Sequence, residues 1–146
     1  MRARLYYHLT WTTRLRAATL DASIARFLGR YLPAVARQER ARVLELGLVR
    51  THVHVLFEAN PGTQLPRLVQ RFKGGSSALA RKERHARENG AFGWTKGYSI
   101  ETVSPRALPA VRAYVREQAK HHPREAVPGW PEWIESPPVS DPPSAE

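Results

Sequence analysis

The stretch VLELGLVRTHVHVLFEA, residues 43–59, consists of two apolar-rich runs separated by only two residues. This pattern predicts two strands, over residues 43–49 and 52–59, joined as a tightly connected antiparallel pair. The turn-forming residues Asn60-Pro61-Gly62 then close the second strand. We infer the rest of the fold from this pair outward.

The flanking segments alternate between strand-like and helix-like patterns. Residues 4–13 alternate apolar and polar side chains, which predicts a strand, whereas residues 20–35 repeat apolar side chains at helical spacing after a cap at Thr19 or Asp21. The further expected elements are a helix over residues 65–79 interrupted at Gly74-Gly75, a helix end and loop over 81–93, a strand over 94–103, and a helix from Ser104 to about His121. The order β-α-β-β-α-β-α favours an α+β fold of the ferredoxin-like or RRM-like split-sandwich type, an antiparallel β-sheet with helices packed on it.

The length and composition restrict the kind of protein this can be. A chain of 146 residues fits one ordinary domain with its own core. It has no cysteine, which excludes disulfides, zinc–thiolate sites, iron–sulfur clusters and thiol catalysis. The first residues lack the apolar stretch of a secretion signal and no later run is long enough to span a bilayer, so we expect a cytoplasmic location.

The positive charge is concentrated in residues 1–124. Residues 125–146 contain five acidic side chains and no Lys or Arg, so residues 1–124 hold 23 basic and 8 acidic side chains, an excess of 15. A polyanion explains this excess most simply, with nucleic acid as the first expected partner and an anionic membrane as the second. Because the charge is spread over several predicted elements instead of one amphipathic segment, we expect no membrane partner.

The C-terminal end has a different composition from the rest. Seven of the twelve prolines lie from Pro123 onward, and Trp130 and Trp133 are the large aromatic residues there. We therefore expect a domain over residues 1–123 and a Pro-rich, acidic C-terminal tail over 124–146, extended or disordered and held in place by its tryptophans.

The first chemical signal is His52-Val53-His54 inside a predicted strand. Side chains at positions i and i+2 of a strand share a face, so the two imidazoles point the same way. Two convergent nitrogens can begin a divalent-metal site. The alternative is that the two histidines are surface or hydrogen-bonded residues.

The second signal is Tyr114 and Gln118, four residues apart and therefore on one face of the last predicted helix. A tyrosine phenol can attack phosphorus, and an amide oxygen is an acceptable ligand for Mg²⁺ or Mn²⁺. The alternative is that Tyr114 belongs to an ordinary core stripe with its apolar neighbours Leu108, Val111 and Val115.

With these motifs in order, the sequence resembles the single-tyrosine HUH transposases, the small insertion-sequence transposases and REP-associated tyrosine transposases. The stretches that carry the resemblance, over roughly residues 5–122, are Tyr7-His8-Leu9-Thr10-Trp11-Thr12-Thr13, His52-Val53-His54-Val55-Leu56, Leu68-Val69-Gln70-Arg71-Phe72-Lys73-Gly74, Trp94-Thr95-Lys96-Gly97-Tyr98, and Tyr114-Val115-Arg116-Glu117-Gln118 through His121-His122. Two positions depart from the family pattern. Thr51 stands where Asp or Asn is usual, and Gly75 stands where a basic residue is common.

The resemblance implies a mechanism. His52, His54 and Gln118 would hold Mg²⁺ or Mn²⁺, and Tyr114 would attack the scissile phosphate of single-stranded DNA to give a 5′-phosphotyrosine and a free 3′-hydroxyl. His8 could lie beside the histidine pair or make a structural hydrogen bond, and His121 and His122 are alternative third ligands. The DNA would carry a short hairpin, and family members often assemble as dimers, so a homodimer and a monomer both stay open.

Basic and aromatic side chains between these motifs fit the DNA substrate. Single strands are bound by backbone charge and base stacking, and the residues expected to supply both are Arg67, Arg71, Lys73, Trp94, Lys96 and Tyr98. Core packing is the alternative role for Trp94. The segment Gly74-Gly75-Ser76-Ser77 could present N–H groups to a phosphate at a helix start, or its glycines could allow close packing.

Three other functions compete with this interpretation. A catalytically silent module that binds hairpin DNA would explain the charge and the aromatic residues, although it would not need the histidines, tyrosine and glutamine together. A nucleotide hydrolase of the histidine-triad type would need a third histidine at position 56, where the chain has Leu56. A protein of the membrane surface is disfavoured by the distribution of charge.

Overall fold

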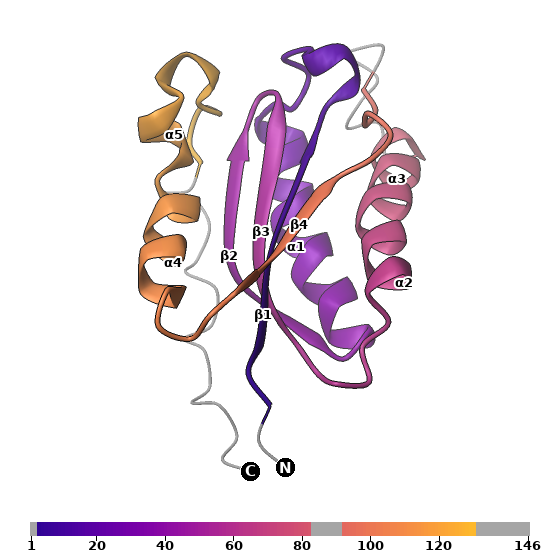
Figure 1. Ribbon diagram of the computed structural model, residues 1–146. Coiled ribbons are helices and arrows are strands. Elements are labelled where there is room, and N and C mark those ends of the chain that lie inside the picture. The colour runs from indigo at the N-terminus through magenta and orange to yellow at the C-terminus, as the bar shows by residue number, and fades with distance from the viewer. Residues whose placement is uncertain (1–2, 83–91, 131–146) are drawn as a thin grey trace.

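Residues 3–82 and 92–130 are described by a computed structural model, drawn in Figure 1. Within them lies a four-stranded antiparallel sheet of order β2-β3-β1-β4. The strands are β1 (Leu5–Thr12), β2 (Ala41–Val49), β3 (His52–Ala59) and β4 (Ser99–Val103). This arrangement confirms the predicted α+β fold with an antiparallel sheet.

The helices lie on both faces of the sheet (Figure 1). One face is covered by α1 (Ala22–Gln38) and by a second, continuous helical stretch that consists of α2 (Leu65–Gln70), the π-helical segment η2 (Arg71–Gly75) and α3 (Ser76–Lys82). The other face carries α4 (Leu108–Arg116) and α5 (Gln118–His121), and the short turns η1 (Arg14–Arg16) and η3 (Pro123–Glu125) complete the described elements. No helix within the described ranges is long and apolar enough to cross a membrane.

The main core lies between the sheet and α1. Alternation along β1 and β3 directs the buried side chains of Leu9, Trp11, Val53 and Phe57 toward this helical layer. Asp21 caps α1, because its Oδ1 accepts a 2.9 Å hydrogen bond from the Ile24 amide. The predicted alternation of β1 is confirmed. Of the two residues predicted to cap α1, Asp21 is the one that does so.

The opposite face of the sheet is only half covered. Its small core consists of Tyr6, Leu44, Leu56, Val103 and Val115. Helices α4 and α5 pack on β2 and β3. Along β4, Ser99 and Glu101 are exposed. The face therefore has an open strip along β1 and β4, next to the helix that carries Tyr114.

Two predicted element boundaries are wrong. The strand expected from residue 94 begins at Ser99, and Trp94 makes only an isolated bridge to Thr13. The helix expected from Ser104 begins at Leu108, and residues 105–107 form a turn before it, in which Ser104 Oγ accepts a hydrogen bond from the Ala107 amide. Breaks of this kind depend on local hydrogen bonds that side-chain periodicity does not encode.

The glycine pair does not interrupt the second helical stretch. Gly75 lies in the π-helical segment, and a Cβ there would come within 2.0 Å of the Tyr31 hydroxyl. Ser76 and Ser77 are buried inside the continuing helix, so the segment does not form the helix start that the phosphate-binding alternative required. Close packing of Tyr31 explains why no side chain is present at position 75.

Part of the acidic tail packs against the domain. Residues 123–125 form η3, Ala126 bridges to Val49 of β2, and Val127 and Trp130 are buried in the main core. The expected extended tail therefore does not begin before residue 131. The predicted loop over 81–93 lies largely outside the described residues, and Trp133 lies outside them altogether.

Candidate active site

Histidines from the two central strands meet on the half-covered face. His54 of β3 is 6% exposed, and its Nδ1 lies 2.8 Å from His8 Nε2 and 3.2 Å from Thr10 Oγ1, both on β1. These contacts follow from the β1–β3 register, which places Thr10 opposite His54. The contacts occupy Nδ1 of His54 and leave its Nε2 as the nitrogen that could bind a metal.

The second histidine of the motif meets the predicted glutamine. His52 Nε2 lies 3.4 Å from Gln118 Oε1, and both side chains are buried. The Gln118 amide has a defined orientation, because its Nε2 donates a 3.0 Å hydrogen bond to the Tyr114 carbonyl. The amide oxygen is therefore the atom that faces His52.

Burial keeps the three imidazoles uncharged at neutral pH. It lowers the pKa of His54 to about 3, with the nearby imidazoles of His52 and His8 adding to the effect. Burial likewise lowers the pKa of His52 and of His8. An uncharged imidazole has a free nitrogen lone pair, which is the form that binds metals.

The donor set fits a hard divalent cation. Two imidazoles and one amide oxygen are ligand types that Mg²⁺ and Mn²⁺ accept, with the remaining positions open to water or phosphate oxygens. Of these three donors, two are histidine nitrogens and the third is the Gln118 amide oxygen. Among residues 3–82 and 92–130, no cluster of three or more His, Cys, Asp or Glu side chains forms a metal site.

A glycine lets the Gln118 helix approach the sheet. Gly47 of β2 pairs with His54, and a Cβ on Gly47 would lie 2.3 Å from the Val115 carbonyl oxygen and 2.8 Å from Gln118 Cγ. Any larger residue would push α4 and α5 away from β2. Gly47 was not singled out from the sequence, because its role depends on a helix that lies 68 residues later in the chain.

A buried carboxylate on β2 holds α4. Glu45 is 7% exposed, and its Oε1 lies 2.6 Å from Arg116 Nη2 and 3.4 Å from Arg112 Nε. The two arginines come from successive turns of α4, so their shared ion pair fixes the helix along β2. The same ion pair raises the pKa of Arg116.

Tyr114 lies beside the histidines of its own chain. Its ring centroid is 5.7 Å from that of His54 and 6.1 Å from that of His8. The side chain is 44% exposed, so the core role considered for Tyr114 is wrong, although its neighbour Val115 is fully buried. An accessible phenol next to a potential metal site suits a nucleophile.

Comparison with known proteins identifies the family. Residues 2–118 match the family model described as transposase IS200 like. The chain belongs to the IS200-like transposase family. It is 23% identical over 116 residues to the transposases for insertion sequence element IS200 of Salmonella typhimurium and Salmonella typhi, which covers 77% of this chain and 75% of theirs. The chain is therefore a transposase, and its activity is part of DNA transposition.

Solved structures of similar proteins share the fold. A candidate transposase from Deinococcus radiodurans R1 is 27% identical, with a TM-score of 0.63 over 81% of this chain and 93% of that one. A REP-associated tyrosine transposase, bound to a REP hairpin in its structure, is 12% identical, with a TM-score of 0.61 over 84% of this chain and 72% of that one. At 12% identity the second comparison supports the fold alone.

Two further histidines of this transposase lie near the site. His121 is exposed, and its ring centroid is 5.1 Å from that of Tyr114. The His122 ring packs edge-on against His52 at 5.0 Å, and its Nδ1 lies 3.4 Å from Glu125 Oε2. Their predicted role as alternative third ligands stays a prediction, whereas Gln118 is the side chain within reach of His52 Nε2.

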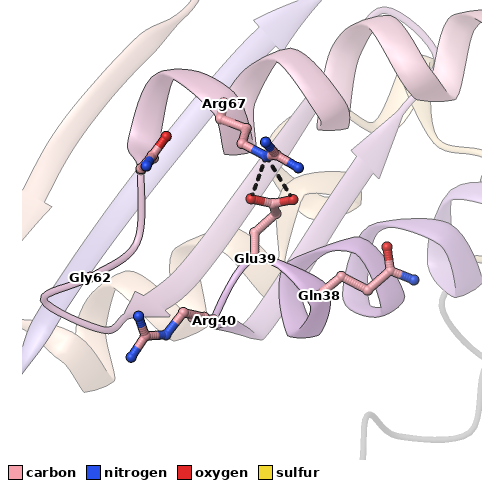
Figure 2. Close-up of a pocket in the computed structure, with 6 residues that line it drawn as sticks. Gln38, Glu39, Arg40, Gly62 and Arg67 are labelled. Carbon is pink, nitrogen blue, oxygen red and sulfur yellow. Dashed lines mark hydrogen bonds and ion pairs between the residues drawn. The ribbon is translucent and has the colours of Figure 1, made fainter.

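The residues predicted to bind DNA fall into two groups. Arg67 and Arg71 lie on the helical layer, where both make ion pairs with Glu39. Figure 2 shows this region, a pocket lined by Gln38, Glu39, Arg40, Gly62, Gln64 and Arg67. The pocket is formed by the end of α1 and the two residues after it, the β3–α2 connection and α2, so it does not include the histidine site.

The second group surrounds the connection before β4. Lys73 donates hydrogen bonds to the carbonyls of Thr95 (2.9 Å) and Gly97 (2.5 Å), and its Nζ lies 5.9 Å from the centre of the Tyr98 ring. Lys73 thus holds the connection in place, and its partial burial lowers its pKa.

The remaining members of this group differ in exposure. Lys96 and Tyr98 are exposed. Trp94 packs against Trp11 and donates a hydrogen bond to Ser76 Oγ. These contacts support core packing, the alternative to DNA binding for this residue. Lys96 and Tyr98 are the members most accessible to DNA.

Proposed function

We propose that this transposase is a metal-dependent, single-stranded DNA endonuclease and strand transferase that acts through a 5′-phosphotyrosine. The observation that carries the proposal is the position of Tyr114. Its exposed phenol lies beside His54 of the same chain, and its carbonyl accepts the hydrogen bond that orients Gln118. The nucleophile on α4 and the proposed ligand Gln118 on α5 are thus joined by a hydrogen bond.

The proposed ligands are His52 Nε2, His54 Nε2 and Gln118 Oε1, and Mg²⁺ or Mn²⁺ is the expected cation. When bound, the cation supplies charge stabilisation to the scissile phosphate. The protein residues contribute rigidity. Thr10 and His8 hold the His54 ring, and the packing of α4 at Gly47 holds Gln118.

The proposed reaction is a transesterification. Tyr114 Oη forms a bond to phosphorus and gives up its proton to water or a nearby base, while the bond from phosphorus to the 3′ oxygen breaks and that oxygen takes up a proton. The products are a 5′-phosphotyrosine and a free 3′-hydroxyl. The number of phosphodiester-type bonds is unchanged, so the reverse reaction can rejoin DNA without ATP.

The open strip of the sheet suits the substrate. Single-stranded DNA that crosses β1 and β4 would pass Tyr114 and meet Lys96 and Tyr98 at the connection before β4. We propose that the bound DNA carries a hairpin, as the REP-associated transposase of similar fold binds a REP hairpin. The proposed catalytic groups lie together within one chain, so we propose that Tyr114 serves the site of its own chain, whether the protein acts as a monomer or as a homodimer.

Adduct formation tests the proposal directly. The full chain is incubated with labelled single-stranded DNA from its own genomic flanks, in Mn²⁺ or EDTA, and resolved on a denaturing gel. We expect a metal-dependent protein–DNA adduct that is lost in Tyr114→Phe and in His54→Ala. Hairpin binding without an adduct in any metal would overturn the nuclease proposal and favour the catalytically silent hairpin-binding module.

A further inference from the structure

The segment after α5 is held against the edge of β2 by its main chain. The Arg50 amide donates a 2.8 Å hydrogen bond to the Glu125 carbonyl, and Ala126 forms a bridge with Val49. Val127 and Trp130 then enter the main core. This segment lies beyond residues 2–118, the part of the chain that matches the family model. Its anchoring needs no contact from the Glu125 side chain.

The Glu125 carboxylate is nevertheless fixed at both oxygens. Its Oε1 accepts a hydrogen bond from the Thr51 hydroxyl, and its Oε2 lies 3.4 Å from His122 Nδ1. Thr51 is 6% exposed, and its hydroxyl oxygen also lies 3.0 Å from Nδ1 of His52. A line of contacts therefore leads from Glu125 through Thr51 to a proposed metal ligand.

The direction of these hydrogen bonds determines where His52 carries its proton. A hydroxyl has one proton to donate, and the Thr51 proton is used by the carboxylate, which can only accept. The contact between Thr51 and His52 must then be donated by Nδ1–H of the imidazole. A neutral imidazole has one N–H, so Nε2 of His52 carries a bare lone pair.

That lone pair faces a second acceptor. Gln118 Oε1 lies 3.4 Å from His52 Nε2, and the amide orientation is fixed by its bond to the Tyr114 carbonyl. Two acceptors pointed at each other are unfavourable without a positive group between them. A cation between His52 Nε2 and Gln118 Oε1 would stabilise this arrangement.

We propose that Glu125 is a positioning residue that acts through Thr51 to hold His52 in the Nδ1-protonated form required at the metal site. This inference rests on the proposed function, because it assumes that His52 is a ligand. Partners of this kind around metal-binding histidines fix the tautomer and the ring orientation, and their loss typically weakens metal affinity. The chain therefore completes its site with a residue from outside the family-matched region.

Metal affinity of the full chain is the first test, measured by Mn²⁺ EPR on matched variants. We expect Thr51→Val, which keeps the side-chain shape, and Glu125→Ala each to weaken Mn²⁺ binding by about tenfold. Thr51→Ser keeps the hydroxyl and should restore affinity close to that of the wild type. Glu58→Ala removes a carboxylate at the far end of β3, where it pairs with Arg42, and controls for the loss of one charge.

The tautomer of His52 is a second test that requires no metal. Long-range ¹⁵N–¹H NMR spectra of the metal-free wild type should show the His52 proton on Nδ1. In Thr51→Val the proton should move toward Nε2, where Gln118 Oε1 can accept it. A role confined to anchoring the C-terminal segment would change thermal stability and leave the tautomer unchanged.

These measurements separate the two proposals. A His52 proton on Nε2 in the wild type, or unchanged Mn²⁺ affinity in both Thr51→Val and Glu125→Ala, would overturn the positioning role. If instead His52→Ala leaves Mn²⁺ binding intact, the proposed metal site is wrong. The NMR spectra of metal-free protein still decide the positioning role in that case.

Discussion

Gly47 lies opposite His54 in the β2–β3 ladder, and the Val115 carbonyl oxygen fills the space that a Cβ on Gly47 would need. The sheet strand that supports the histidines and the helix that carries Tyr114 and Gln118 are therefore in backbone contact. Since backbone on both sides must move to admit a methyl group, the geometry of the site depends on this glycine.

Gly47→Ala should displace α4 and α5 and weaken metal binding. The expected cost of such overpacking is about 1–3 kcal/mol in the free energy of unfolding, measured by urea denaturation. Adduct formation with single-stranded DNA should fall together with Mn²⁺ affinity. Gly74→Ala is the matched control, because a Cβ at Gly74 meets no atom within 4 Å. Full activity in Gly47→Ala would show that α4 can shift without consequence.

Local patterns predicted the elements of this site well. Alternation along a strand is a local property, so the shared face of His52 and His54 and the burial of Leu9 could be predicted from the sequence. Helical spacing likewise placed Tyr114 and Gln118 on one side of the last helical region. It did not predict that this region breaks at Glu117, between α4 and α5.

Contacts between distant segments could not be predicted in the same way. Gly75 leaves room for the Tyr31 hydroxyl, and Gly47 leaves room for the Val115 carbonyl. Thr51 donates a hydrogen bond to Glu125. The partners in these three pairs lie 44, 68 and 74 residues apart. No periodicity links such positions, and they became visible only when the tertiary packing was known. Composition also suggested an extended tail, although apolar residues such as Val127 join the core.

Gln118→Glu and Gln118→Leu should have different effects on metal binding. Glutamate keeps an oxygen ligand but loses the N–H that donates to the Tyr114 carbonyl, so metal-free protein should be destabilised and Mn²⁺ should restore its melting temperature. Leucine keeps the volume but removes one of the three proposed ligand atoms, so Mn²⁺ should raise the melting temperature much less than in the glutamate variant. Calorimetry in EDTA and in Mn²⁺ checks both variants. An equal response of the two would argue against Gln118 as a ligand.

Metal-free protein should lose stability on mild acidification. The pKa of His54 is about 3 in the folded chain and 6.5 in the unfolded chain. Between these values the unfolded state binds more protons, so the free energy of unfolding falls as the pH drops below 6.5. From pH 7 to pH 5 this single residue should contribute a loss of about 2 kcal/mol.

Urea denaturation in EDTA at several pH values measures this loss. His54→Asn removes the titrating group, and its stability should depend less on pH over the same range. His121→Asn, at an exposed histidine on α5, is the matched control for the substitution itself. Equal slopes for wild type and His54→Asn would contradict the assignment.

Exposed residues of the connection before β4 should contribute directly to DNA affinity. Tyr98 is 49% exposed next to the open strip, and stacking of one base on an aromatic ring is worth about 1–3 kcal/mol. Tyr98→Ala should therefore weaken binding of a single-stranded oligonucleotide, measured by fluorescence anisotropy, with little change in stability. Lys96→Ala should lower both the affinity and its salt dependence, because it removes one phosphate contact. Arg30→Ala, at an exposed position of α1 on the helical face away from the site, is the control for charge alone, and an equal loss in all three variants would indicate nonspecific attraction instead of a defined DNA path.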